Sequence, residues 1–436
     1  MSIEELKRRV LKAIDERAEE IIGVGDAIWR QPELGYKEFK TAKLVESKYE
    51  EMGWEYKKGI AITGSKAYLK RPGPRPALGI IGELDSVRCP DHPECDPITG
   101  AVHACGHNAQ IAAMLGAGFG LSDSGVIDKL EGNVVMVTVP AEEYLEIDYR
   151  NSLREKGQLE FLGGKQEFIH VGELADIDIS LGTHTAMDIE EKLSVGGSGN
   201  GFVGKLVRYV GLEAHAGGAP DKGINALNAA MLGLMGIHAQ RETFREEDTI
   251  RVHPIITKGG EIVNNVPADV RLESYVRGRT VDAIIDANKK VNRALRAGAM
   301  AVGAEVEIND IPGYMPYTPH EGLSEIFRAN CVELVGEDLV KVDTEHSTGS
   351  TDLGDVSCIM PTGAIGMGGV EGTGHGRTYK VVDKELEYVT PAKVLAMACI
   401  DLLYGGAAKA REVIGSFKPA IPPKEYTAFM RKLVEG

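Results

Sequence analysis

The chain has 436 residues, of which 26% are charged and 43% hydrophobic, and its formal net charge is −16. A length of this size predicts two domains with large buried cores. The negative charge argues against nucleic acid and anionic membranes as partners, because both favour patches of Lys and Arg. No apolar run is long enough to span a bilayer, the N-terminus shows no signal-peptide core, and the six cysteines are scattered, so the sequence predicts a cytoplasmic protein.

The first part of the chain predicts two helices and a buried strand. Residues 3–30 and 36–52 carry apolar positions at helical spacing, which is typical of amphipathic helices. The apolar run 77–84 is typical of a strand buried in a parallel sheet. Asp85 follows this run directly, at the end of the strand where open α/β sheets place their sites.

A thiol and two imidazoles lie close together in the stretch His-Ala-Cys-Gly-His-Asn-Ala-Gln, residues 103–110. A helix-like apolar run, 111–121, follows at once. Cys105 and His107 are good zinc ligands, and a junction between strand and helix would hold them on a rigid base. A buried free cysteine beside a core histidine is the alternative interpretation of this pair taken alone.

Two further predicted strands end in residues that can bind a metal or move a proton. The strand 133–139 stops at Pro-Ala-Glu-Glu, which contains Glu142 and Glu143, and the strand 177–181 is followed by His184. Adjacent carboxylates are costly to bury unless one binds a metal and the other handles a proton, although a solvated acidic loop is an alternative. The repeated placement of such residues at strand ends predicts one site built from several loops.

A second possible metal-binding stretch lies between Cys89 and Cys95, which flank Asp91, His92 and Glu94. Prolines at positions 90 and 93 favour a surface loop over a second metal site there.

The pattern of predicted helices and strands changes near residue 194. The following pattern predicts β-α-β-β-α-β, with strands 202–211, 249–258, 269–277 and 305–309 and helices 224–241 and 281–302. This is the order of a ferredoxin-like unit, a complete small domain. The prediction is therefore a first domain in two parts, 1–193 and 313–436, with a domain inserted at 194–312.

The resumed part carries a predicted helix 322–335, a strand 362–366 and a helix 386–403. Between the last two lies His375, flanked by Gly374 and Gly376, which allow a ligand to approach the backbone closely. His375 is thus a further candidate metal ligand.

The motifs together resemble metallopeptidase family 20, the family of aminoacylases, auxin-conjugate amidohydrolases and aminobenzoyl-glutamate hydrolases. The resemblance rests on Asp85, His-Ala-Cys-Gly-His at 103–107, Pro-Ala-Glu-Glu at 140–143, His184, Ala-His-Ala-Gly at 214–217, residues 264–267 and Gly-His-Gly at 374–376. It implies an α/β fold: a two-metal, aminopeptidase-like catalytic domain, with a mixed sheet flanked by helices, and an inserted ferredoxin-like α+β dimerisation domain. It also implies hydrolysis of the amide bond in an N-acyl amino acid, an aminobenzoyl-glutamate-like conjugate or a dipeptide.

The resemblance assigns roles to individual residues. It implies that Cys105 bridges two metals, that His107 and His184 complete one metal shell and that Glu143 and His375 complete the other. Glu142 is the implied general base, with Asp85 supporting the site. The implied substrate-facing residues are His215, Asn264 and Arg277, which would face the oxyanion or carboxylate of the substrate from the same chain or from the partner subunit. The implied cofactors are two divalent ions per subunit, zinc or manganese, with cobalt or nickel and single occupancy as alternatives. The implied partners are a small-molecule substrate and a second copy of the chain, in a homodimer through the inserted domain or in a higher oligomer.

Two positions depart from the usual pattern of the amidohydrolase branch. That branch continues Cys-Gly-His with Asp, one residue and His, whereas this chain has Asn108 and Gln110. Cys-Gly-His-Asn is more similar to the aminobenzoyl-glutamate and β-alanyl-lysine hydrolase branch.

Two functions remain as alternatives to amide hydrolysis. They are an arylamine deaminase on the same metal site and a catalytically dead, metal-dependent binding protein.

Overall fold

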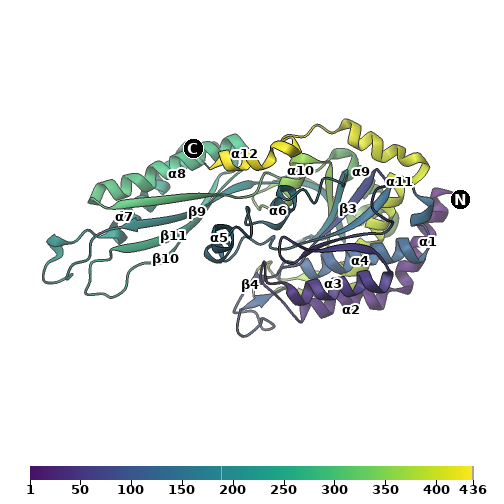
Figure 1. Cartoon of the computed structure of the whole chain (residues 1–436), viewed down its shortest axis with the longest axis horizontal. Helices are drawn as coiled ribbons and strands as arrows, with labels where there is room; N and C mark the ends of the chain where they lie inside the picture. The colour runs from purple at the N-terminus through teal and green to yellow at the C-terminus, as the bar shows by residue number, and fades with distance from the viewer. Residues whose placement is uncertain (188, 435–436) are drawn as a thin grey trace. The chain divides into compact units, whose positions relative to one another are not determined.

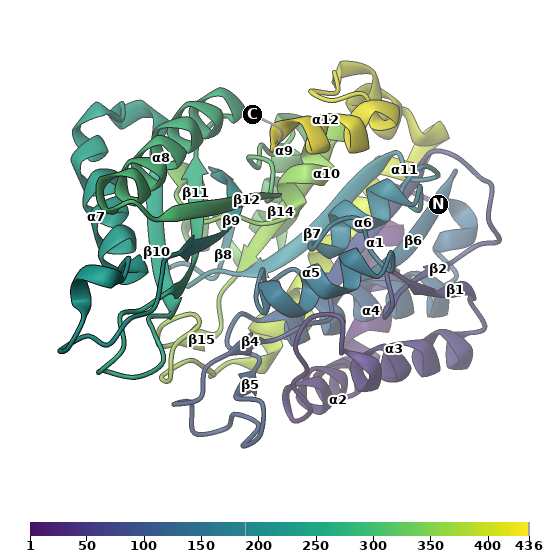
Figure 2. The same ribbon diagram turned by 60° about the vertical axis from the view of Figure 1, so that its left-hand side comes forward.

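The computed structural model describes residues 1–187 and 189–434, and their contacts form two compact units (Figures 1 and 2). The first unit comprises residues 1–198, 318–345 and 355–423. The second comprises residues 199–317, 346–354 and the C-terminal residues from 424. Residues 346–354 therefore belong to the same unit as the inserted segment.

A sheet of eight strands forms the centre of the first unit. In spatial order the strands are β1 (Glu55–Ile60), β2 (Gly64–Tyr68), β6 (Asn133–Val139), β3 (Ala77–Glu83), β7 (Ile179–Thr185), β14 (Thr362–Met367), β8 (Leu193–Gly199) and β13 (Val340–Ser347). The neighbours β6, β3, β7 and β14 run parallel to one another, and β2 and β8 pair antiparallel with β6 and β14. The carboxyl ends of the four parallel strands therefore meet at one edge of the sheet.

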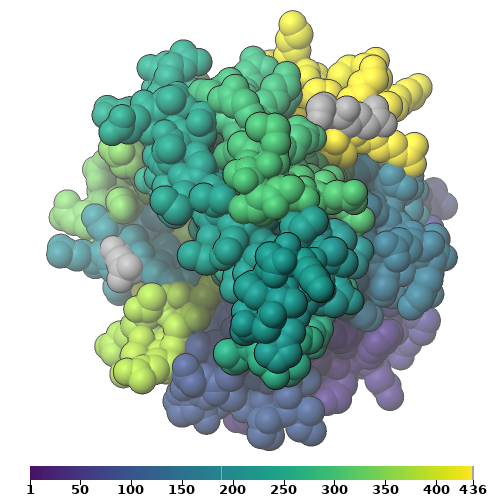
Figure 3. Space-filling view, turned by 90° about the vertical axis from the view of Figure 1, so that its left-hand side faces the viewer, coloured from purple at the N-terminus to yellow at the C-terminus, as the bar shows by residue number. Residues whose placement is uncertain are grey.

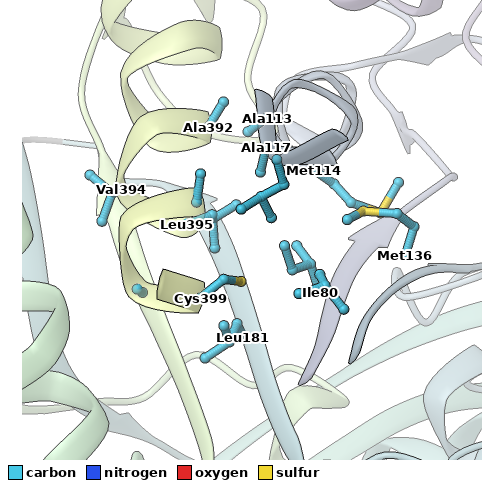
Figure 4. Close-up of a cluster of buried hydrophobic side chains, with 14 of the residues drawn as sticks. Ile80, Ala113, Met114, Ala117, Met136, Leu181, Ala392, Val394, Leu395 and Cys399 are labelled. Atoms are coloured by element: carbon cyan, nitrogen blue, oxygen red, sulfur yellow. The ribbon is translucent and has the colours of Figure 1, made fainter. Parts of the chain in front are cut away.

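Helix α4 (His107–Asp123) lies against this sheet and is buried on all sides over residues 107–121. A helix that is apolar all round needs neighbours on every face. They are β3, β6 and β7 together with the helices α1 (Ile3–Glu16), α2 (Ala18–Trp29), α3 (Phe39–Met52) and α11 (Thr390–Ser416). Figure 4 shows the resulting core, in which Met114 of α4 and Leu395 of α11 lie above Ile80 and Leu181 of the sheet.

Smaller elements complete the part of the chain around this sheet. They are β4 (Val87–Arg88), β5 (Ala101–Val102), α5 (Ile147–Glu155), α6 (Gly164–His170), α9 (Glu321–Val335), α10 (Leu353–Ile359), β15 (Val370–Glu371) and β16 (Lys380–Val381). Among them, α6 contacts β6 and α9 contacts β14.

Three predicted boundaries were wrong. The predicted helix 3–30 is two helices, because the backbone leaves the helical conformation at Arg17, whose guanidinium donates to Asp123 and Glu20. The predicted strand 177–181 is shifted to 179–185, so that His184 lies within β7. The predicted helix 386–403 begins as a π-helical turn, Glu385–Val389, and continues to Ser416 with non-helical backbone at 404–407.

The second unit has the predicted β-α-β-β-α-β order. Its elements are β9 (Gly201–Val210), α7 (Ala226–Gln240), β10 (Arg251–Lys258), β11 (Asp269–Gly278), α8 (Val281–Val302) and β12 (Glu305–Pro312). The antiparallel sheet has the order β10-β11-β9-β12, and α7 and α8 contact β9 and β11. Helix α12 (Tyr426–Leu433) contacts β12. Figure 3 draws this unit in teal and green.

The fold class is the predicted one, α/β with a large mixed sheet flanked by helices and a ferredoxin-like insert. Within the described part of the chain, no helix combines the length and the apolar character needed to cross a bilayer.

Candidate metal centre

The candidate metal-binding residues of the first unit lie at the carboxyl edge of its parallel strands. They come from five segments: Asp85 after β3, Cys105 and His107 at the start of α4, Glu142 and Glu143 after β6, His184 at the end of β7, and His375 in the loop between β15 and β16. The N–H of His375 donates to the carbonyl of Ala104 over 2.8 Å, which ties this distant loop directly to the Cys-Gly-His turn.

The thiol of Cys105 lies at the centre of these residues. Its Sγ is 3.5 Å from Nε2 of His184 and 3.3 Å from Nε2 of His375. Nε2 of His375 lies in turn 3.0 Å from Oε1 of Glu143. The ligand atoms of Cys105, His107 and His184 all lie within 4.8 Å of one another, and so do those of Cys105, Glu143 and His375. The structure thus gathers two groups of potential ligands that share the thiol.

The turn between Cys105 and His107 depends on glycine at position 106. Gly106 has a φ of 88°, and a Cβ built there would lie 1.8 Å from Oγ1 of Thr185. Thr185 follows His184 in β7, and its hydroxyl donates to Glu387 over 2.5 Å. Any other residue at 106 would therefore clash with the strand that carries His184, so this glycine sets how closely the two parts of the site approach.

Asp85 accepts hydrogen bonds from three of the candidate residues, Glu142, Glu143 and His107. Its carboxylate accepts the backbone N–H groups of Glu142 at 3.1 Å and Glu143 at 2.9 Å. Its backbone carbonyl accepts a hydrogen bond from Nδ1 of His107 over 2.9 Å. The proton on Nδ1 leaves Nε2 of a neutral His107 as the nitrogen that can bind a metal.

The charges of the site favour a bound cation. Burial and the charge of Glu143 would raise the pKa of Cys105, but the neighbouring imidazoles of His184 and His107 lower it to about 6. Burial would lower the pKa of His184, but the Cys105 thiolate raises it to about 10. Without a metal, protons therefore provide the positive charge between these donors, and metal binding would displace them.

The donor set fits divalent metal ions. It combines a thiolate, imidazole nitrogens and a carboxylate, which are the ligands of zinc and similar metals. Nε2 of His107 is buried and makes no hydrogen bond to any described residue, although a polar atom in such a place normally has a partner. A cation would provide that partner.

The metal-free protein is expected to ionise at Cys105 near pH 6, far below an ordinary thiol. The thiolate absorbance near 240 nm should appear with that midpoint, and metal affinity should fall as the pH is lowered through it, because protons then compete for the sulfur. Cys105→Ala should lack this transition, whereas Cys331→Ala should keep it, because burial raises the pKa of Cys331 to about 12. A midpoint above pH 8 in the parent protein would contradict the expected ionisation.

The stretch between Cys89 and Cys95, a possible metal site, is a loop that His92 fastens to the backbone near Tyr379. Nε2 of His92 lies 2.9 Å from the carbonyl of Tyr379, and its Nδ1 accepts the N–H of Glu94 at 3.1 Å. The Glu94 carboxylate accepts the indole N–H of Trp29. Both nitrogens of His92 are thus engaged, and over the described residues every group able to hold a metal lies at the centre around Cys105 and His107.

Sequence reasoning did not single out Glu83, Lys165 or Glu387, which border the site. Oε2 of Glu83 lies 3.0 Å from Nε2 of His107, and Lys165 donates to Oε1 of Glu83 over 2.6 Å. Glu83 could have been found, because residues two apart in a strand share a face and Asp85 was already a candidate. Lys165 and Glu387 carry no such local signal, because only the tertiary fold brings them near.

The three candidate substrate residues belong to the second unit. Nδ1 of His215 accepts the N–H groups of Gly217 at 3.2 Å and Gly218 at 2.9 Å, which places the proton of the neutral ring on Nε2. The carbonyl of Asn264 accepts the N–H of Ala216 over 2.8 Å, so His215 and Asn264 lie close together.

Arg277 lies elsewhere in this unit. Its Nε donates to Nε2 of His253 over 3.1 Å and its Nη1 to Ser350 over 3.2 Å. Asn264 precedes the first residue of β11, Asp269, whereas Arg277 is near the end of this strand. Eight residues of strand at about 3.3 Å each separate the two ends by about 26 Å. Within one chain, Arg277 is therefore not brought together with His215 and Asn264.

Comparison with known proteins decides the family. The model of peptidase family M20/M25/M40 matches residues 79–398, a stretch that includes every segment of the candidate metal centre. The chain belongs to this family. Members of peptidase family M20 are metal-dependent, and membership makes the protein a hydrolase of amide or peptide bonds.

The similarity to relatives in the family extends over most of the chain. Human Xaa-Arg dipeptidase is 28% identical over 429 residues, which cover 92% of this chain and 90% of the relative. Two solved structures share the fold. They are an aminobenzoyl-glutamate utilization protein from Klebsiella pneumoniae (TM-score 0.67, 17% identity, 90% of this chain and 98% of that one) and the YXEP protein of Bacillus subtilis, a dinuclear metal binding peptidase (TM-score 0.65, 20% identity, 89% and 99%).

Proposed function

We propose that this protein cleaves the amide bond of an N-acyl amino acid, an aminobenzoyl-glutamate-like conjugate or a dipeptide with the help of divalent metal ions. The observation that carries the proposal is the convergence of Cys105, His107, His184, Glu143 and His375 around one thiol, with Glu142 beside them. The names of the human relative and the Klebsiella structural neighbour support small conjugates of amino acids as substrates.

Two divalent ions, zinc or manganese, fit the two groups of ligands that share Cys105. His107 and His184 would hold one ion, and Glu143 and His375 the other. The description of the Bacillus neighbour as a dinuclear metal binding peptidase supports two ions. When bound, such ions acidify a water molecule and polarise the amide carbonyl of the substrate.

Glu142 is the proposed general base. Its backbone N–H is fixed by Asp85, and its Oε2 is 3.9 Å from Nε2 of His107, so the carboxylate borders the ligands. Glu142 would accept the proton of the attacking water and deliver it to the leaving amine. His215, whose proton lies on Nε2, can donate to the oxyanion of the tetrahedral intermediate, a contribution of about 3 kcal/mol. Arg277 can bind a substrate carboxylate with its guanidinium.

We further infer that two copies of the chain form each complete site. Arg277 and the pair His215 and Asn264 are about 26 Å apart along β11, whereas an extended dipeptide spans only about 7 Å. A substrate that contacts both needs one of them from a partner. The second unit also exposes apolar side chains on the edge strand β10 and on α7, which would be covered in a dimer: Ile255, Ile256, Met231, Leu232 and Met235. These surfaces support the proposal of a homodimer through this unit.

Heterodimers should recover activity from two inactive variants. Glu142→Gln removes the base of one chain and His215→Ala the oxyanion donor of the other. If His215 acts on the partner's site, a heterodimer of the two retains one intact site and about half of the parent activity. The measurement is turnover by heterodimers isolated with two different affinity tags. Heterodimers as inactive as either homodimeric variant would show that His215 acts on its own chain, whereas an active His215→Ala homodimer would show that His215 does not act at all.

The substrate class is tested with a panel of N-acyl amino acids, aminobenzoyl-glutamate and dipeptides, including Xaa-Arg dipeptides, in the presence of zinc, manganese or cobalt. Release of a free amino acid from at least one group is the expected result. Ammonia release from arylamines, without cleavage of any conjugate, would instead indicate a deaminase.

We propose the cytoplasm as the location of the protein. Its six cysteines are all free thiols, which suits a reducing compartment.

A further inference from the structure

A buried ion pair lies beside His107, and the proposed reaction does not use it. Glu83, the last residue of β3, is 5% exposed, and Lys165 in α6 is fully buried. Nζ of Lys165 donates to Oε1 of Glu83 over 2.6 Å, and Nε2 of Gln110 in α4 donates to Oε2 over 2.6 Å. Burying a carboxylate and an ammonium group costs several kcal/mol per ion before their attraction is counted. Such a pair is costly to keep if it serves packing alone.

Oε2 of Glu83, which accepts the amide N–H of Gln110, also faces the proposed metal ligand His107. Nδ1 of His107 donates to the carbonyl of Asp85, so Nε2 of the neutral ring carries a lone pair. That Nε2 is buried, makes no hydrogen bond to any described residue, and lies 3.0 Å from Oε2 of Glu83. Two lone pairs at this distance repel each other, so a positive charge is needed beside them. Without a metal that charge is a proton, because burial would lower the pKa of His107 but the charge of Glu83 raises it well above its ordinary value, and a bound cation would take the place of that proton.

The spacing is that of two neighbours in one coordination shell. Ligand atoms about 2.1 Å from an ion and about 90–110° apart lie about 3.0–3.4 Å from each other. Glu83, His107 and Glu142 also form a third group whose ligand atoms all lie within 4.8 Å of one another. Glu142 is the more distant member, with Oε2 3.9 Å from Nε2 of His107, which leaves it available for proton transfer.

We propose that Glu83 is a further ligand of the divalent ion held by His107, and that Lys165 and Gln110 hold the Glu83 carboxylate in position. The proposal rests on the metal centre proposed above. It gives Gln110 a specific role: its amide donates to Glu83 on the face of the carboxylate that also meets His107. It also gives the buried charge of Lys165 a role, since it balances the charge that Glu83 brings to a dry site.

Cobalt titration of the metal-free protein tests this assignment. The parent protein should bind two Co²⁺ ions per chain, with a sulfur-to-cobalt charge-transfer band from Cys105. Glu83→Gln should keep that band, lose at least about tenfold in affinity for one ion, and change the visible d–d absorption, which reports the ligands. Affinities are measured by competition with a chromophoric chelator, so the test does not depend on activity.

Glu83→Gln leaves Lys165 buried without its charge partner, which can impair folding. The double variant Glu83→Gln/Lys165→Met removes both charges and should show the same weakened ion. Glu167→Gln is the matched control, because Glu167 is also buried on α6 but accepts the N–H groups of Glu160 and Phe161. It should bind both ions as the parent does.

The possible outcomes separate the ligand role of Glu83 from the proposed metal centre itself. Parent affinity and spectrum in the folded Glu83 variants would overturn the ligand role of Glu83. Equal weakening in Glu167→Gln would also overturn it, because the effect would then follow from losing any buried carboxylate. Failure of the parent protein itself to bind cobalt would instead overturn the proposed metal centre.

Discussion

Glu142→Gln is expected to lower kcat by about 10²–10⁴-fold and to leave the metal content unchanged. The amide has nearly the shape of the carboxylate but cannot accept a proton, so the attacking water loses its base. The loss corresponds to about 3–5 kcal/mol of activation free energy. The turn that carries the residue should persist, because Asp85 holds the backbone N–H of Glu142 and not its side chain. The measurements are kcat on a cleaved conjugate and metal per chain by elemental analysis.

Glu143→Gln is the matched control, since it changes the adjacent carboxylate in the same turn. Burial would raise the pKa of Glu143, but its hydrogen bond to His375 and the charge of that ring lower it to about 2, which suits an anionic ligand. Glu143→Gln should therefore lose metal, whereas Glu142→Gln should keep it. If the two variants exchanged these phenotypes, or if Glu142→Gln turned over at the parent rate, the base would be misassigned.

Much of the candidate site could be predicted because its signals are local. Cys105 and His107 are two residues apart at the start of α4, and Asp85 follows a strand that is buried along its whole length. Such short patterns depend on the backbone near each residue. What the sequence could not supply is the adjacency of β3 to both β6 and β7, which brings Glu143 and His184 to the same edge.

Features that depend on long-range contacts escaped prediction. Arg17 interrupts the N-terminal helix where it meets Asp123, a residue at the far end of α4. Lys165 pairs with Glu83 across 82 residues of chain, and the sequence around Lys165 gives no indication of this partner. Helix propensity and periodicity describe only a window of residues, so they contain no information about such partners.

The departure at position 108 also has a tertiary explanation. The amide of Asn108 donates to the carbonyl of Gly25 over 3.3 Å and to the hydroxyl of Tyr388 over 3.1 Å. Asn108 therefore fastens the start of α4 to α2 and to the π-helical turn Glu385–Val389. A residue with this role affects the metal centre through the position of α4, and its change from aspartate removes no donor from the two groups that share Cys105.

Cys105→Ala is expected to abolish the binding of both metal ions. The thiol is the one residue common to the two groups, Cys105 with His107 and His184, and Cys105 with Glu143 and His375. Its loss removes a ligand from each ion and the negative charge between them. Replacement of His184 or His375 by alanine should weaken mainly one ion, so the three variants together distinguish a bridging ligand from a terminal one. Metal per chain is measured after dialysis against a low metal concentration.

Thermal unfolding provides an independent readout of the same change. A metal that binds only the folded state stabilises it by RT ln(1 + [L]/Kd), about 2.7 kcal/mol at 100 times Kd. Added zinc should therefore raise the Tm of the metal-free parent and leave that of Cys105→Ala nearly unchanged. Cys399→Ala, in the core beside α4, is the control: it should lower the Tm but keep the response to zinc, because Cys399 lies outside both ligand groups. Full metal content in Cys105→Ala would rule out the bridging thiolate.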